Sequence, residues 1–432
     1  MEKIFYNDNA FDKKLNKLYH RPSYPPEIEE SVKQILADVR KNGDTALSTY
    51  AKKFDKVDLT PDMFLVGDEE IKKISRTISN SWKKAIKEAL ANVEFFSKQR
   101  IPQPWSSSPR PGVIVGERFE PMERVGVYIP GGTAPLVSTV IHTAGLAKAA
   151  GVREIVAVTP PAADGSIHPA VLYAMRQAGV TEVYRLGGVY GIAALAYGTE
   201  SIKKVEKIVG PGNAYVTAAK KLVYGEVAID MIAGPSEIMV IADERCNPAF
   251  IAADMLSQAE HGSGFEQTVL LSTDKDLINE VEKELLEQKT KLSRQKTVEK
   301  VLADGTFLIH VKDMTQAAEI ASSYAPEHLE IQCRKAGNIA KQVKAAGAIF
   351  IGQWTPEPIG DFCAGPSHVL PTAGSGRYFS GLTVEGFFRR MSILNYQKSA
   401  LKKEVETAVK FAEMEGLDAH GRSATIRFES EK

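Results

Sequence analysis

The sequence predicts an α/β protein with mostly parallel sheets covered by helices, and three observations lead to this fold class. From about residue 110 onward, short apolar runs alternate with amphipathic helical patterns, as in repeated strand–helix–strand units. Before that point, residues 6–103 are charged and carry apolar residues at three- and four-residue spacing, which is typical of helices. The chain of 432 residues is also too long for one ordinary core, so we expect at least two domains.

In chain order, helices come first, in segments such as EIEESVKQILADVRKNG and SWKKAIKEALANVEFFSKQR. After a break at IPQPWSSSPRPG, a βαβαβ unit is predicted from VGVYI, PLVSTVIHTAGLAKAAG, EIVAVTP, HPAVLYAMRQAG and EVYRL. Further strands are expected in AIDMIAGPSEIMVIAD, TVLLSTD, TFLIHV and AIFIG, which predict a second α/β layer. From about Gly381 the pattern is helical to the end.

Composition narrows the function classes. Lys plus Arg and Asp plus Glu each number 54, so the formal net charge is zero. Overall charge therefore does not favour binding to nucleic acid or to an anionic membrane. The three cysteines lack a CxxC pair, which argues against a disulfide framework or a thiolate zinc site. No signal peptide or membrane-length apolar run is found, so we expect a cytoplasmic protein acting on a small molecule.

The segment RCNPAFIAADMLSQAEHG predicts a helix over about residues 248–261, capped by Asn247 and followed by Gly262. A spacing of three puts Gln258 and His261 on one face, so both can touch one object. A polar helix end explains this pair equally well. Zinc needs three or four ligands and no HExxH motif is present, so further ligands would have to come from distant segments.

Three later segments each pair a carboxylate with an imidazole in a polar, turn-rich setting. An adjacent Glu-His pair follows Pro326, where we expect a helix to start, and a solvated helix start accounts for it as well. The three pairs are Glu327 and His328, Asp361 and His368, and Glu415 and His420.

The sequence signals for nucleotide binding are weaker than those for the carboxylate–imidazole pairs. No GxGxxG is present, which leaves the usual dinucleotide fingerprint unsupported. The turns VYIPGGTAPL and KIVGPGNAYV can offer backbone amides to a phosphate at helix starts, although purely structural turns look the same.

Taken in order, seven motifs resemble the histidinol dehydrogenase family over nearly the whole chain: GVYIPGGTAPLVSTV, KIVGPGNAYVTAAK, IDMIAGPSEIMVIAD, DMLSQAEHG, YAPEHLE, GDFCAGPSHVLPT and EGLDAHGRS. The resemblance implies two similar, incomplete Rossmann-like domains of the aldehyde-dehydrogenase kind in an intertwined homodimer. It places an arm at residues 1–25, a first domain at 26–127 and 238–380, an inserted NAD-side domain at 128–237, and a helical segment reaching the partner at 381–432.

The resemblance further implies oxidation of L-histidinol to L-histidine through bound L-histidinaldehyde, with two NAD and one zinc ion per subunit. Glu327 would activate water and His328 would act as the base, without the cysteine of aldehyde dehydrogenases. The implied zinc ligands are Gln258, His261, Asp361 and, from the other subunit, His420. The implied substrate contacts are Ser236, Gln258, His261, His328, Asp361, His368, Glu415 and His420.

For NAD, the family positions fall on Tyr128, Tyr190 and Asn213. The family usually has Gln where this chain has Tyr190, so an altered contact is expected there, and the loop HGSGFEQ is slightly longer than the family's usual form. Two alternatives stay open on the residues alone: a related zinc- and NAD-dependent dehydrogenase of another small polar alcohol, and a zinc hydrolase.

Overall fold

A computed structural model describes residues 1–21, 26–131 and 135–431, and these form two compact units. The first contains residues 1–100 and 122–386, and the second contains residues 101–121 and 387–432. The proposed phosphate turn VYIPGGTAPL includes residues 132–134, which lie outside the described residues. Within the described part of the chain, no helix has the length and apolar character that crossing a membrane requires.

The N-terminal region is helical, as predicted, after one short strand. Ser79 caps the longest uninterrupted helix, α5, by accepting a hydrogen bond from the Trp82 amide. The buried face of α5 carries Ile86, Ala89 and Val93. The elements are β1 (Glu2–Phe5), α1 (Phe11–Tyr19), α2 (Pro26–Tyr50), the π-helical η1 (Ala51–Asp55), α3 (Pro61–Phe64), α4 (Asp68–Ser75) and α5 (Asn80–Lys98).

A five-stranded parallel sheet follows, in the order β6-β5-β4-β7-β8. The predicted βαβαβ unit is confirmed as β4 (Arg124–Tyr128), α6 (Val137–Ala150), β5 (Glu154–Val158), α7 (Pro169–Gln177) and β6 (Glu182–Tyr184). The unit continues with α8 (Gly188–Tyr197), β7 (Lys207–Val209), α9 (Ala214–Val223) and β8 (Ala228–Ile229). Helices α2, α8 and α9 share one apolar core with this sheet.

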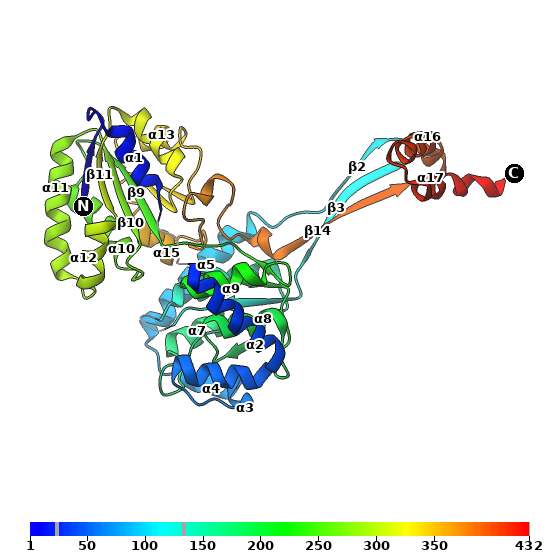
Figure 1. Ribbon diagram of the computed structural model, residues 1–432, viewed down its shortest axis with the longest axis horizontal. Coiled ribbons are helices and arrows are strands. Elements are labelled where there is room, and N and C mark those ends of the chain that lie inside the picture. The colour runs from blue at the N-terminus through cyan, green and yellow to red at the C-terminus, as the bar shows by residue number, and fades with distance from the viewer. Residues whose placement is uncertain (22–25, 132–134, 432) are drawn as a thin grey trace. The chain divides into compact units, whose positions relative to one another are not determined.

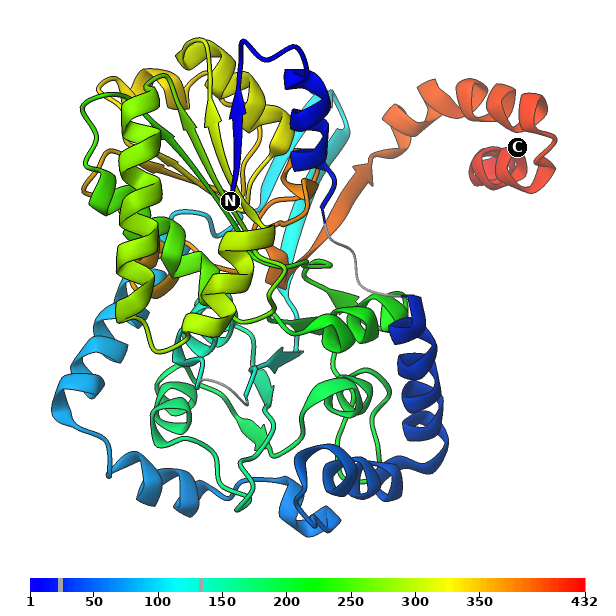
Figure 2. The ribbon, with the colours of Figure 1, turned by 60° about the vertical axis from the view of Figure 1, so that its left-hand side comes forward.

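A six-stranded parallel sheet, in the order β1-β11-β10-β9-β12-β13, forms the rest of the first unit. Its strands after β1 are β9 (Glu237–Ala242), β10 (Gln267–Ser272), β11 (Thr306–His310), β12 (His328–Ile331) and β13 (Ala348–Ile351). Its helices are α10 (Pro248–Ala259), α11 (Lys275–Gln288), α12 (Gln295–Asp304), α13 (Met314–Tyr324), α14 (Ala336–Ala340) and α15 (Glu357–Phe362). Figure 2 shows β1, in blue, beside the yellow strand β11.

Both faces of this sheet are covered, which explains why its strands read as continuous apolar runs. Along β9, Met239 and Ile241 enter one core with α1 and α13, while Ile238 and Val240 enter another with α10, α11 and α12. The two groups of helices lie on opposite sides of the sheet in Figure 1.

One prediction in this region is wrong. Residues after Pro326 were expected to start a helix, whereas His328 is the first residue of strand β12. The strand lies in the interior of the sheet, paired in parallel with β9 on one side and β13 on the other. Such pairing joins segments far apart in the sequence and outweighs a local helix-start pattern.

The second unit is an antiparallel sheet with C-terminal helices. Its strands, in the order β14-β3-β2, are β2 (Trp105–Arg110), β3 (Val113–Pro121) and β14 (Phe388–Tyr396), followed by α16 (Lys398–Glu415), α17 (Asp418–Thr425) and the 3₁₀ turn η5 (Ile426–Glu431). The prediction of a helical segment from about Gly381 is therefore wrong for residues 388–396, because this segment pairs with β3 along its whole length.

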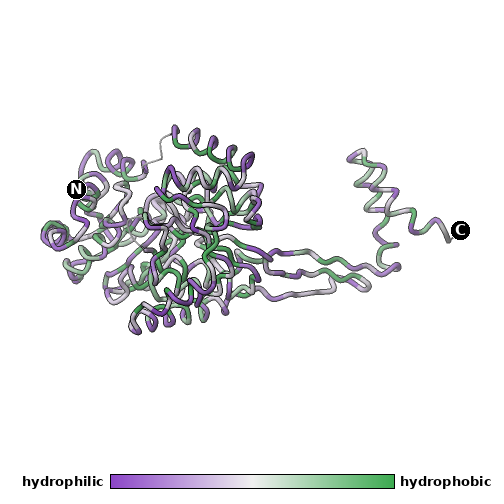
Figure 3. Tube along the Cα trace, turned by 90° about the horizontal axis from the view of Figure 1, so that it is seen from below, coloured by the Kyte–Doolittle hydropathy of each residue, from purple (hydrophilic) through white to green (hydrophobic). Residues whose placement is uncertain are grey.

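Hydrophobic residues recur along the helices of the second unit (Figure 3). Several of them are exposed in the single chain, namely Phe411, Met414, Leu417 and Ile426, together with Ile393 and Leu394 on β14. This unit therefore carries apolar surface that a monomer leaves in water.

Candidate active site

Helix α10 and the turn that follows it carry the first candidate pair, Gln258 and His261. As predicted, it follows the cap Asn247, whose side chain accepts from the Ala249 amide at 2.9 Å, and has Pro at its first position. It ends at Ala259, two residues earlier than predicted, so His261 lies in the turn after the helix rather than in its last turn. Gly262, at φ 108°, then reverses the chain.

Gln258 and His261 differ in the hydrogen bonds that their side chains make. Gln258 is 0% exposed, yet neither its amide nitrogen nor its amide oxygen has a hydrogen-bond partner among the described residues. His261 is exposed as a residue, although burial of its ring lowers the pKa of the imidazole. Its Nδ1 lies 2.9 Å from Oγ of Ser236. This contact occupies one ring nitrogen and leaves Nε2 for another partner.

Glu327 and His328 are both held by the backbone of Glu237 at the start of β9. The Glu237 amide donates to Oε2 of Glu327 at 2.9 Å, and its carbonyl oxygen lies 3.0 Å from Nδ1 of His328. A carbonyl can only accept, so Nδ1 carries a proton and Nε2 has the free lone pair when the ring is neutral. Nε2 lies 3.3 Å from Oδ1 of Asp361.

The charges of these groups depend on one another. Burial raises the pKa of Glu327 to about 8, although His328 opposes the shift. Burial disfavours the charged form of His328, but the carboxylates of Glu327 and Asp361 raise its pKa to about 10. Burial alone would raise the pKa of Asp361, but contact with His328 holds it well below its ordinary value. A carboxyl that is readily protonated therefore lies next to an imidazole that readily holds a proton.

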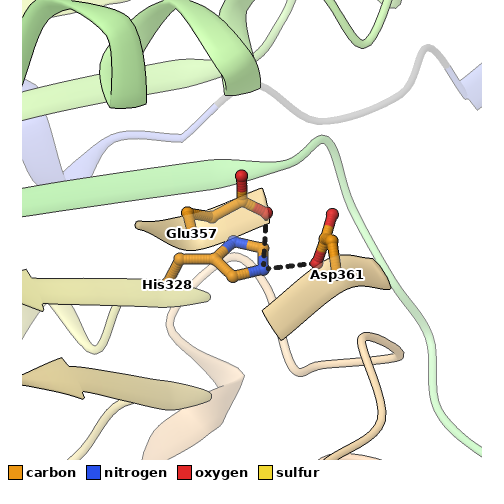
Figure 4. A group of neighbouring side chains, drawn as sticks. All are labelled: His328, Glu357 and Asp361. Atoms are coloured by element: carbon orange, nitrogen blue, oxygen red, sulfur yellow. Dashed lines mark hydrogen bonds and ion pairs between the residues drawn. The ribbon is translucent and has the colours of Figure 1, made fainter. Parts of the chain in front are cut away.

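Glu357 joins this cluster, although the sequence analysis did not select it. Its carboxylate lies 3.7 Å from Nε2 of His328, as Figure 4 shows, and accepts from Oγ of Ser257 at 2.9 Å. Glu357 and Asp361 are four residues apart on α15, so they share one face of this short helix. That spacing in EPIGD was the signal available in the sequence.

Among the described residues, one group offers three metal-ligand atoms within 4.8 Å of one another, and it consists of His328, Glu357 and Asp361. It shares only Asp361 with the ligand set that the resemblance implies. His368 belongs to the same neighbourhood. Burial lowers its pKa, Asp361 opposes the shift, and His261 and His328 add to it.

Glu415 and His420 belong to the second unit. Glu415 is the last residue of α16, His420 lies in α17, and both are exposed. The first unit thus brings together most of the predicted residues: Ser236, His261, Glu327, His328, Asp361 and His368.

The predicted cofactor residues lie at the five-stranded sheet. Tyr128 ends β4, and its hydroxyl accepts from the Gly188 amide at 3.1 Å. Tyr190 is 1% exposed, and its hydroxyl donates to the carboxylate of Asp55. Asn213 is exposed and caps α9 by accepting from two amides at its start. The expected contact between the Tyr190 hydroxyl and the cofactor therefore competes with the hydrogen bond from that hydroxyl to Asp55.

Comparison with known proteins gives consistent results over the whole chain. The family model described as histidinol dehydrogenase matches residues 20–428. Histidinol dehydrogenases of Listeria monocytogenes serovar 1/2a and Bacillus cereus are 45% and 46% identical over 405 residues, covering 94% of both chains in each pair. The crystal structure of histidinol dehydrogenase from Elizabethkingia anophelis superposes with a TM-score of 0.94 at 35% identity, covering 100% of this chain and 98% of that one.

Proposed function

The chain belongs to the histidinol dehydrogenase family, and we propose that it oxidises L-histidinol to L-histidine with two molecules of NAD, completing histidine biosynthesis. The observation that carries this proposal is the buried arrangement of Glu327 and His328 beside Asp361, in a chain that matches the family from residue 20 to residue 428. The reaction removes four electrons in two steps. It needs a base for both oxidations and a group that activates water between them.

Zinc fits the donors in this region. Within the part of the chain that the structure describes, the side-chain amide of Gln258 is buried without a hydrogen-bond partner. Its carbonyl oxygen, an imidazole nitrogen and a carboxylate oxygen can all coordinate zinc. We assign zinc to Gln258, His261 and Asp361, with His420 supplied by the other subunit of a homodimer. The alternative group containing His328 is disfavoured because a metal on Nε2 would occupy the lone pair that the base needs.

When bound, zinc would supply a Lewis acid that orients the substrate and polarises its oxygen. In its neutral form, with Nδ1 protonated and held by the Glu237 carbonyl, His328 would take the hydroxyl proton on Nε2. The same nitrogen would serve again in the second oxidation. Glu327 would accept a proton from the water that attacks the aldehyde, and its raised pKa of about 8 suits a group that changes protonation near neutral pH.

Substrate specificity would come from side chains around this pair. Ser236 holds the ring of His261 in one orientation. His368 is close enough to Asp361 for the charge of that carboxylate to act on its imidazole. Together with Glu415 from the partner subunit, these groups would hold the imidazole and amine of histidinol. The exposed apolar residues of the second unit, including Phe411 and Met414 on α16, support a homodimer, since association would remove them from water.

For the cofactor, we propose a site at the carboxyl ends of the five-stranded sheet, lined by Tyr128, Tyr190 and Asn213. NAD would accept the hydride in each step. Because the hydroxyl of Tyr190 is bonded to Asp55, this residue would shape the site by its ring rather than donate to NAD. The domain arrangement proposed is an NAD-side domain at 128–237 inserted into a first domain at 26–127 and 238–380, of incomplete Rossmann-like type, in a cytoplasmic enzyme.

A direct experiment tests the activity. The purified, zinc-loaded protein is incubated with L-histidinol and NAD, NADH is followed by its absorbance, and the product is identified by mass spectrometry. We expect two NADH per histidine formed. Hydrolysis without NADH, or oxidation of other small alcohols in preference to histidinol, would overturn the proposal.

A further inference from the structure

One buried histidine has no part in the proposed mechanism. His142 lies in the middle of α6 and is 0% exposed. Neither ring nitrogen makes a hydrogen bond of good geometry among the described residues, and only the backbone of Asp361 and Phe362 offers weaker polar contacts. Its neighbours along the helix, including Val140, Ile141 and Ala144, are buried and apolar. Buried polar groups are nearly always hydrogen-bonded, so an imidazole in this place requires an explanation.

His142 contacts the loop that carries His368 through both its ring and its backbone. The two imidazole centroids are 4.7 Å apart with 33° between the planes. Oγ of Ser367 donates to the carbonyl oxygen of His142 at 3.1 Å and accepts from the Val369 amide at 3.1 Å. The position of His368 therefore depends on α6, although the two segments are far apart in the sequence.

Both rings have unused hydrogen-bonding capacity. Nε2 of His368 is also buried without a partner among the described residues. A neutral imidazole offers one N–H donor and one acceptor nitrogen. The 4.7 Å separation of the ring centroids leaves room for one imidazole to donate to the other once the rings turn. Such a bond at one ring nitrogen fixes which tautomer the ring presents at the other.

We propose that His142 is a positioning residue: it hydrogen-bonds to His368 and thereby fixes the tautomer and orientation in which His368 meets histidinol. This inference rests on the proposed function, because it assigns His142 to the substrate site of that reaction. It concerns substrate binding through His368, and His142 itself touches neither substrate nor zinc.

The test measures histidinol binding at equilibrium, by titration calorimetry on the zinc-loaded protein without NAD. His142→Met keeps the volume and removes the hydrogen bonds, and we expect histidinol affinity to fall about tenfold, the size of one lost hydrogen bond. His142→Gln keeps a donor and an acceptor and should restore most of the affinity. Equal weakening in both variants would mean that only packing matters, and would overturn the proposal.

A double-mutant cycle tests whether His142 acts through His368. In a His368→Asn background, His142→Met should weaken binding no further, whereas an undiminished additional loss contradicts the proposal. His310→Met is the matched control, since His310 is also buried and packs at 5.0 Å against Tyr6 in the six-stranded sheet. It should bind histidinol as the wild type does.

Two outcomes separate this inference from the proposed function. Failure of the wild-type protein to bind or oxidise histidinol overturns the function, and the inference with it. Normal binding by both wild type and His142→Met overturns the inference alone. If His142→Met does not fold, His142→Leu provides the same comparison with His142→Gln.

Discussion

The carbonyl oxygen of Glu237 lies 3.0 Å from Nδ1 of His328, while the amide of the same residue donates to Glu327. One residue at the start of β9 therefore orients both members of the proposed catalytic pair. Its own carboxylate is paired with Arg21 at 2.7 Å and accepts from the Ala373 amide at 3.0 Å. The pair is thus held by backbone atoms of a central strand, which move little when surface side chains change.

This arrangement predicts different defects for the two residues. His328→Ala removes a base used twice, so oxidation of histidinol and of histidinaldehyde should each fall about 10²–10⁴-fold. Glu327→Gln should slow histidinaldehyde oxidation far more than the first hydride transfer, because the proposed role of Glu327 is to activate water. Single-turnover measurement of NADH with each substrate distinguishes them, and equal slowing of both steps by Glu327→Gln would refute the division of labour.

Zinc binding is tested by removing nitrogen ligands. His261→Asn and His420→Asn should each lower zinc content, measured by elemental analysis after dialysis, and activity should fall in parallel. His168→Asn is the control, because His168 caps α7 through Nδ1 and Asn is itself a good cap. Full zinc occupancy in both ligand variants would count against the assigned site.

A shared active site predicts complementation between two inactive proteins. One chain carries Glu327→Gln and His328→Ala, the other carries His420→Asn, and their heterodimer should contain one intact site. Activity should return on mixing, to at most about half of the wild-type value per dimer, because only one of two sites is complete. If mass spectrometry confirms subunit exchange and no activity returns, His420 does not act across the interface.

The hydrogen bond between Tyr190 and Asp55 predicts that replacing Tyr190 will change the affinity for NAD. Tyr190→Gln introduces a side-chain amide that can both donate a hydrogen bond to the cofactor and accept one from it. NAD should therefore bind about three- to tenfold more tightly in calorimetric titrations. The same change should lower the free energy of unfolding by about 1–3 kcal/mol, since Asp55 loses its partner. Tyr190→Phe loses only the hydroxyl and should lower stability without strengthening NAD binding. Unchanged or weaker NAD binding by the Gln variant would contradict this prediction.

Glu330 predicts a dependence of stability on pH. Burial, and then the charge of Asp254, raise the pKa of Glu330 to about 9. A carboxyl whose pKa is higher in the folded than in the unfolded protein contributes its full stabilisation at pH values below the unfolded-state pKa. This contribution to the free energy of unfolding is lost as the pH rises toward 9. Glu330→Gln stays neutral, so relative to the wild type it should be more stable at pH 8.5 than at pH 5.5. Urea unfolding at both pH values measures this, with the exposed Glu280→Gln as control. An identical difference at both pH values would contradict the raised pKa.

The sequence alone determined the local elements and the identity of most candidate residues. The cap at Asn247 and the alternating apolar runs from Arg124 to Tyr184 fixed their helices and strands, because propensity, capping and apolar periodicity act over a few residues. The family motifs supplied Glu327, His328 and the residues proposed for zinc, because each motif is read within a short segment.

Only the tertiary structure decided how these residues are held. His328 lies in an interior strand because β9, from a distant part of the chain, pairs with it on one side and β13 pairs on the other, which no local pattern reveals. The same applies to β14, whose antiparallel partner β3 precedes it by more than two hundred residues. The contacts of Glu237 with the proposed catalytic pair and of His142 with His368 likewise depend on long-range packing, since sequence periodicity specifies which face a residue occupies but not which distant group it meets.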